Sequence, residues 1–232
     1  MDDATDTVND STLPWSSIVA IGPDAESFLQ GQLSQDLADV DARGVWSLLL
    51  APDGIVLTSI LVTPILDGFV LVVPRSLGEV ALTRLRRFLL RTKCTLELAD
   101  VEVGPYATTE EQIAAGRPGA AEFALGLTPQ CYGASFVAET VSFTKGCFTG
   151  QELVGRLDAR GSSVPWRMVR ASGPNVERVS EVLHAKGPAG TSGVTTWTRD
   201  GQSVVALGIA HRSLIGSDEL TRAGDVSVEE IA

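Results

Sequence analysis

The chain has 232 residues, of which 44% are hydrophobic and 20% charged, so it is expected to bury a core large enough for one large domain or two small ones. Its formal net charge of −11 disfavours non-specific binding to nucleic acid and to anionic membrane surfaces, although a local basic pocket for a small anion stays open. No stretch approaches the ~18 consecutive apolar residues of a membrane span, so neither a nucleic-acid nor a membrane partner is expected.

The ends and the cysteines indicate where the protein works. Residues 1–12 are acidic and lack an apolar run, so we expect a disordered tail and no signal peptide. Cys94, Cys131 and Cys147 form no Cys-x-x-Cys pair, so no metal site made by this chain alone is expected. An odd number of thiols without an export signal favours a reducing, cytoplasmic location.

The first hundred residues alternate between strand and helix patterns. Residues 15–21 predict a strand, and a short helix follows it. Residues 44–74 contain three apolar runs that are separated by the turn dipeptides Asp53-Gly54 and Asp67-Gly68, which predicts successive antiparallel hairpins.

An amphipathic helix is predicted over residues 77–91, because Ser76 and Glu79 have the spacing of a capping box before apolar residues at helical spacing. Residues 93–103 then predict another strand, which completes an α+β unit with helices packed on an antiparallel sheet. The other face of the helix carries three arginines that could contact an anionic ligand, although such a face is more often solvated: Arg84, Arg87 and Arg91.

The rest of the chain divides near Ser163. Between residues 104 and 140 a short helix is predicted at 107–115, followed by a long ordered loop over 116–135. After Ser163, alternating runs between glycine-rich turns predict a small C-terminal antiparallel β-barrel over 163–232. These runs are residues 164–172, 179–187, 190–198 and 203–214. They contain His184 and His211, which we interpret as structural.

The octet "KGCFTGQE", residues 145–152, concentrates the chemistry-bearing side chains just before a helix predicted to end at Gly161. At a helix start, free N–H groups and the helix dipole stabilise a thiolate at Cys147 or an anionic ligand oxygen, and Lys145 adds positive charge. Gln151 and Glu152 could read the donors and acceptors of a heterocycle.

A purely structural interpretation of the octet stays equally open. Gly146 and Gly150 would then shape a strand-to-helix turn, Glu152 would cap the helix, and Cys147 would be a small buried residue.

"KGCFTGQE" followed by Arg156 closely resembles the signature Lys-Gly-Cys-(Tyr/Phe)-x-Gly-Gln-Glu of the YgfZ family of folate-binding proteins, which are related to the glycine cleavage T-protein. "GPDAESFLQGQLSQDL" is similar to the N-terminal segment of that family, and "GTSGVTTWTRDGQSVVALGIAHRSL" to its C-terminal barrel. The resemblance covers residues 13–215, so residues 13–162 would form a folate-binding-like α+β region.

The resemblance implies a tetrahydrofolate-binding protein that assists iron–sulfur cluster assembly or repair in client enzymes, some of which modify tRNA. Its partners would be folate, iron–sulfur client enzymes or cluster-assembly proteins. It makes Cys147 the candidate reactive residue. Ten positions match the two motifs: Lys145, Gly146, Cys147, Phe148, Gly150, Gln151, Glu152, Arg156, Gln32 and Asp36. In this superfamily the folate lies in a central cavity between domains.

Two departures bear on function. The chain is shorter than the family in its middle part, 104–140, where Arg117-Pro118-Gly119 is at most a remnant of an Arg-x-x-x-Gly-x-Pro segment. The T-protein has an aspartate within Gly-Gly-Ile-x-Asp-Asp, whereas here Gly54-Ile55-Val56 is followed by Leu57 and Thr58. Without that carboxylate, aminomethyl transfer lacks its obvious acid–base group, so we do not expect a conventional enzyme.

Three functions are consistent with these observations. The first is the folate-dependent accessory factor. The second is a folate-dependent one-carbon transferase or demethylase that uses Asp36 or Glu152 as its base. The third is an interaction module that keeps the fold and has lost the ligand.

Overall fold

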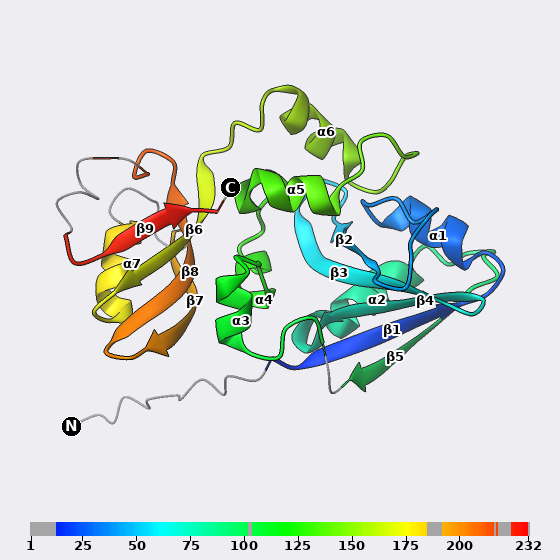
Figure 1. The fold of residues 1–232 in the computed structure, drawn as a ribbon. Helices are drawn as coiled ribbons and strands as arrows, with labels where there is room; N and C mark the ends of the chain where they lie inside the picture. The colour runs from blue at the N-terminus through cyan, green and yellow to red at the C-terminus, as the bar shows by residue number, and fades with distance from the viewer. Residues whose placement is uncertain (1–12, 102–103, 185–191, 216, 218–223, 232) are drawn as a thin grey trace.

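The computed structural model describes residues 13–101, 104–184, 192–215, 217 and 224–231, so the tail expected over 1–12 lies outside it. These residues form an α+β structure with two antiparallel sheets, and helices α3 (Thr109–Ala114) and α4 (Ala120–Phe123) lie between the sheets (Figure 1). Among the described residues, no helix is both long and apolar enough to cross a membrane.

The larger sheet is built from the N-terminal hundred residues in the order β2-β3-β4-β1-β5, and all neighbouring strands are antiparallel. This confirms the strand predicted at 15–21, the two hairpins and the strand within 93–103. The strands are β1 (Trp15–Ile21), β2 (Val45–Leu50), β3 (Val56–Ile65), β4 (Gly68–Pro74) and β5 (Thr95–Val101).

Helices α1 (Ala25–Gln32) and α2 (Gly78–Arg86) pack on this sheet, where Leu29 and Leu85 join a buried apolar core with residues of β1, β3 and β4. Burial of apolar residues of both helices and strands stabilises this layer.

The helix predicted over 77–91 is shorter than expected, and its capping box is wrong. Residues Arg75–Leu77 form a 3₁₀ turn, η1, and Leu77 occupies the N-cap position of α2 without a side-chain hydrogen bond. Ser76 lies inside that turn and cannot cap the helix. The chain leaves the helix after Arg86, since Phe88 N–H donates to Leu85 O and Arg91 has a φ of +63°.

The middle of the chain is more helical than predicted. Helix α3 (Thr109–Ala114) confirms the helix expected at 107–115, and Thr108 caps it by accepting a hydrogen bond from Glu111 N–H. The loop predicted over 116–135 is wrong in part, because it contains α4 (Ala120–Phe123), the 3₁₀ turn η2 (Pro129–Tyr132) and the start of α5 (Ala134–Thr140). Each is too short to show helical periodicity, yet all bury apolar side chains between the sheets.

The C-terminal region begins after α6 (Gln151–Ala159) and forms a sheet in the order β7-β8-β6-β9. The described residues form an open four-stranded sheet, with β7 and β9 at its edges and no closed barrel. The strands are β6 (Trp166–Gly173), β7 (Gly193–Asp200), β8 (Ser203–His211) and β9 (Ser227–Glu230).

The strand expected around 179–187 is wrong, because α7 (Val176–His184) occupies residues up to 184 and the rest lies outside the described residues. Val179, Val182 and Leu183 are buried at i, i+3 and i+4, which is a helical pattern that β-branched residues disguise.

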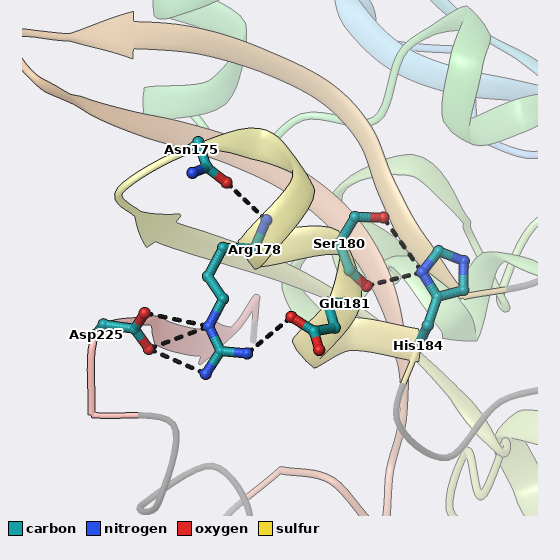
Figure 2. Close-up of polar contacts among 6 residues, drawn as sticks. All are labelled: Asn175, Arg178, Ser180, Glu181, His184 and Asp225. Atoms are coloured by element: carbon teal, nitrogen blue, oxygen red, sulfur yellow. Dashed lines mark hydrogen bonds and ion pairs between the residues drawn. The ribbon is translucent and has the colours of Figure 1, made fainter.

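Figure 2 shows the polar side of α7. Arg178 binds Asp225 and Glu181, and His184 Nδ1 lies 2.7 Å from Ser180 O. His184 therefore ends a helix instead of lying in a strand, whereas His211 lies in β8 as predicted.

Ser34 joins the larger sheet to the middle helices. Its buried hydroxyl donates to Thr140 O at 2.6 Å, at the end of α5, and accepts from Leu48 N–H at 2.8 Å. The backbone adds a bond from Ser142 N–H to Ser34 O of 3.0 Å. One small residue thus satisfies three backbone polar groups from two separate parts of the chain, β2 and the end of α5.

We expect Ser34→Ala to lower the free energy of unfolding by about 2–3 kcal/mol, because it leaves the Leu48 N–H and the Thr140 carbonyl buried without this partner. Urea denaturation measures the loss. Ser27→Ala is the control, since its exposed hydroxyl bonds only to Asp24 O in the same helical turn and its loss should stay within about 0.5 kcal/mol. Equal losses for the two variants would contradict this role of Ser34.

Candidate functional site

The octet 145–152 lies against the end of α1, which brings the two sequence motifs together. The Lys145 ammonium donates to Leu33 O at 2.9 Å and to Gln35 O at 2.8 Å. Thr149 N–H donates to Gly31 O at 3.3 Å. Residues more than a hundred positions apart in sequence are therefore held side by side by the lysine and the backbone.

Lys145 is itself buried, with 9% of its surface exposed, and its Nζ lies 5.6 Å from the centre of the Phe148 ring. Burial lowers the pKa of Lys145 to about 8, although the nearby Asp36 carboxylate acts to raise it. The sequence interpretation treated Lys145 as a source of positive charge for a ligand. In the structure, the ammonium instead donates hydrogen bonds to two backbone carbonyls.

Cys147 is exposed in the octet loop, and Phe148 beside it is buried in the core between the sheets. Burial raises the pKa of both Cys94 and Cys131. Cys131 is buried and Cys94 is half-buried, so Cys147 is the most accessible of the three thiols to a partner or reagent. Among the residues the structure describes, no group of three or more His, Cys, Asp or Glu side chains is placed to hold a metal ion.

The two glycines of the octet differ in what they do. Gly150 has a φ of +83°, and a Cβ there would lie 2.7 Å from Ala51 O. It lets α6 start against the β2–β3 turn, and only glycine fits both constraints. A Cβ on Gly146 would meet nothing within 4 Å, so packing does not require a glycine at that position.

The first turn of α6 faces solvent. Helix α6 starts at Gln151, and Glu152 forms an i,i+4 ion pair with Arg156 at 2.6 Å. Their side chains are 85% and 54% exposed, so this pair contributes little to stability. Gln151, Glu152 and Arg156 are thus available to a ligand only at the surface.

Gln32 and Asp36 flank the carbonyls that Lys145 binds. Asp36 is exposed and accepts hydrogen bonds from Gln30 Nε2 at 2.6 Å and from Ala38 N–H at 3.1 Å. These bonds lower the pKa of Asp36, and Lys145 lowers it further. Gln32 ends α1 and is half-buried.

An aromatic cavity lies between the larger sheet and the middle segment, and none of residues 145–152 lines it. It holds about 590 Å³ of empty space, which includes the part open to solvent. Its lining residues are Leu13, Pro14, Trp15, Trp46, Ser59, Pro74, Ser76, Tyr106, Gln112, Arg117, Pro118, Gly119 and Ala120.

Three rings form the walls of this cavity. Trp46 and Tyr106 stack with ring centres 6.3 Å apart, and Trp15 packs on Tyr106 and donates from Nε1 to Tyr106 O at 2.8 Å. Arg117 lies over Trp46, with its guanidinium carbon 5.4 Å from the ring centre. Flat rings beside a cation suit a planar ligand that carries negative charge.

The cavity contains an amide and a guanidinium but no carboxylate among its described lining residues. Gln112 is buried and donates from Nε2 to Arg117 O at 3.0 Å. The T-protein resemblance would place an aspartate at Leu57 or Thr58. Thr58 is fully buried and its hydroxyl donates to Ser59 O, whereas Leu57 lines a different groove. The cavity can bind a heterocycle but has no side-chain base.

Arg117 links the cavity to the octet. Its guanidinium forms an ion pair with Glu139, and the backbone oxygen of Glu139 accepts from Gln35 Nε2 at 2.7 Å. Gln35 O in turn binds Lys145. The middle segment 104–140, although short, therefore completes a cavity, and the sequence remnant around Arg117 is part of it.

The sequence interpretation missed Trp15, Trp46, Tyr106 and Gln112. They come from four segments spread over about a hundred residues, so no local motif contains them. The sequence has four tryptophans and two tyrosines, and this count does not indicate which of them meet.

The pH dependence of stability tests the buried state of Lys145. Since its folded-state pKa is below the ordinary value of about 10.5, the folded protein releases this proton first, and stability rises as pH increases from about 8 towards 10.5. A neutral amine still has two N–H donors for the two carbonyls. We therefore expect the wild type to gain stability relative to Lys145→Met over this range, measured by urea denaturation at fixed pH.

Lys93→Met, at an exposed lysine, is the control and should show no such gain. A difference between wild type and Lys145→Met that stays constant with pH would mean that the lysine is not desolvated.

Comparison with known proteins adds one finding about the fold. No family model and no curated protein matches the chain. The crystal structure of the glycine cleavage system aminomethyltransferase T from Bartonella henselae is similar, with a TM-score of 0.54 over 85% of this chain and 76% of that chain, at 16% sequence identity. At this identity the likeness shows that the two proteins share a fold.

Proposed function

We propose that the protein binds a tetrahydrofolate in the aromatic cavity and acts as an accessory factor for iron–sulfur client enzymes, without aminomethyl transfer of its own. The observation that carries the proposal is the cavity itself, in which aromatic walls, a guanidinium and an amide meet without a carboxylate. The aminomethyltransferase-like fold and the resemblance of the octet to the YgfZ signature support it.

A folate suits this cavity for physical reasons. Its pterin is a flat heterocycle that can stack on Trp46 or Tyr106, and its amide-like edge offers donors and acceptors to Gln112. Its glutamate tail is anionic, and Arg117, which pairs with Glu139, is the cation that lines the cavity. An apolar, largely aromatic lining with a few polar groups is typical of small-molecule sites.

The alternative of one-carbon transfer lacks a base in the right place. Asp36 and Glu152, the two candidates, are exposed and do not line the cavity. Hydrogen bonds from Gln30 and Ala38 lower the pKa of Asp36 and so make it a weaker base. Glu152 is paired with Arg156. We therefore favour the accessory role over catalysis.

Cys147 is the group through which the accessory role would act. A single exposed thiol cannot hold a cluster by itself, so transient cluster chemistry at Cys147 needs ligands from another protein. Thiol–disulfide exchange at Cys147 needs a disulfide on another protein, from which one thiol is released. This fits a protein that serves cytoplasmic clients or cluster-assembly partners.

The YgfZ resemblance also carries the expectation that the C-terminal sheet closes into a barrel.

Isothermal calorimetry with tetrahydrofolate tests the ligand and its place. We expect the wild type to bind and Trp46→Leu to bind at least about tenfold more weakly, because the variant loses ring stacking. Trp197→Leu, in β7 and outside the cavity, should bind like the wild type. Glu152→Ala should also bind normally.

Loss of binding in Glu152→Ala but not in Trp46→Leu would show that folate binds at the octet and not in the aromatic cavity. No heat with the wild type would refute folate binding altogether.

The role of the thiol is tested in a strain that lacks the gene. Iron–sulfur enzyme activity under oxidative stress should fall, and Cys147→Ser should fail to restore it because the reactive sulfur is gone. Cys94→Ser is the matched control and should restore it. Full restoration by Cys147→Ser would remove the thiol from the mechanism.

A further inference from the structure

A groove that the proposed function does not use runs between α2 and the β2–β3 turn. We call it the arginine groove. It holds about 960 Å³ of empty space, including the part open to solvent. It shares no lining residue with the aromatic cavity. Its lining residues are Ala51, Pro52, Leu57, Glu79, Val80, Thr83, Arg84 and Arg87.

Two guanidinium groups face this groove without a counter-ion. The Nη2 atom of Arg84 is buried and has no hydrogen-bond partner. Within the described part of the chain, neither Arg84 nor Arg87 forms an ion pair. Burial lowers the pKa of Arg84 from its ordinary value, and the neighbouring Arg87 lowers it further. A buried cationic donor without a partner is costly, so a carboxylate that reached it would bind favourably.

The surroundings of the two arginines are apolar. Val80 is 47% exposed, and Phe88, on which the Arg84 guanidinium stacks at 4.4 Å, is 43% exposed. Pro52 and Leu57 line the opposite side. Arginine together with exposed aromatic and aliphatic side chains is the composition of protein-interface hot spots.

The form and charge of the groove favour a polypeptide occupant. A groove this open would leave much of a small molecule in water, whereas small-molecule sites bury most of their ligand. A nucleic acid would meet the repulsion of a chain with net charge −11. Glu79 adds a negative charge to the lining, which disfavours a bare multivalent anion but tolerates a peptide whose acidic group lies at the arginines.

We propose that the arginine groove docks an acidic segment of a partner protein, with a carboxylate bound by Arg84 and Arg87 and a neighbouring apolar side chain packed on Val80 and Leu57. Arg84 then acts as the anchor, because its guanidinium gains an acidic partner that the described part of the free protein lacks. The docking site does not depend on folate binding, since the groove and the aromatic cavity are lined by different residues.

Selection from a phage-displayed random peptide library on the full-length protein tests this proposal. Recovered peptides should combine Asp or Glu with an adjacent Leu, Ile or Phe. Their affinities, measured by fluorescence polarisation, should fall at least about tenfold in Arg84→Gln/Arg87→Gln. The matched control is Arg43→Gln/Arg160→Gln, which removes two exposed arginines elsewhere and should change affinity less than about twofold.

Peptides without acidic residues, or equal affinity for the arginine-groove variant and the wild type, would overturn the proposal. Displacement of the peptides by millimolar inorganic phosphate alone would also overturn it, because the site would then be one for small anions. The double variant should melt no lower than the wild type, since it removes an unpaired buried charge. If it melts lower, Arg87→Gln alone, at an exposed residue, serves for the affinity comparison.

Tetrahydrofolate calorimetry on the double variant should match the wild type. This control distinguishes failure of the docking proposal from failure of the folate proposal.

Discussion

The bond between the Lys145 ammonium and the carbonyls of Leu33 and Gln35 fixes where the octet and the helix after it lie on the larger sheet. These carbonyls lie just past the end of α1, where backbone acceptors have no helical partners, and a buried ammonium satisfies two of them together. Ser34, between them, ties the same short segment to Leu48 and Thr140. The segment therefore holds the sheet, α5 and the octet at one point.

This arrangement assigns the residues of the octet to two different tasks. Its lysine, its aromatic residue and Gly150 act mainly on the protein itself, through carbonyl binding, core packing and the close approach to Ala51. Cys147, Gln151 and Glu152 are then presented at the surface by a loop whose base is fixed. The two interpretations of the octet, structural and functional, thus apply to different residues of the same motif.

The sequence predicted the larger sheet well because each of its strands is long enough to show alternation, and Asp53-Gly54 and Asp67-Gly68 mark the turns between them. It failed where the deciding contacts are not local. Val179 and Val182 favour a strand by their intrinsic propensity, but this segment forms helix α7 because it packs on the second sheet. Ser76 has the right spacing for a cap, but the 3₁₀ turn after Pro74 places it inside η1.

Lys145 was expected to be charged and available to a ligand. The sequence could not predict its burial, because that depends on carbonyls about 110 residues earlier in the chain. The aromatic cavity could not be predicted from the sequence for the same reason, since Trp15, Trp46 and Tyr106 come into contact only when the chain is folded.

Leu57 connects the missing catalytic carboxylate with the arginine groove. The T-protein resemblance leads one to expect an aspartate at Leu57 or Thr58, and the structure places Leu57 in the groove with Arg84 and Arg87, while Ser59, two residues on, lines the aromatic cavity. An aspartate at position 57 would stand in the same groove as the two arginines and would compete for them with any incoming acid. Leucine gives the groove an apolar wall instead, and in the described part of the chain both guanidinium groups stay without an acidic partner. One position in β3 would then account for two properties at once: loss of a base for one-carbon chemistry, and an unneutralised surface suited to an acidic partner. That coupling is consistent with the proposed accessory role, in which the protein acts through the molecules it binds.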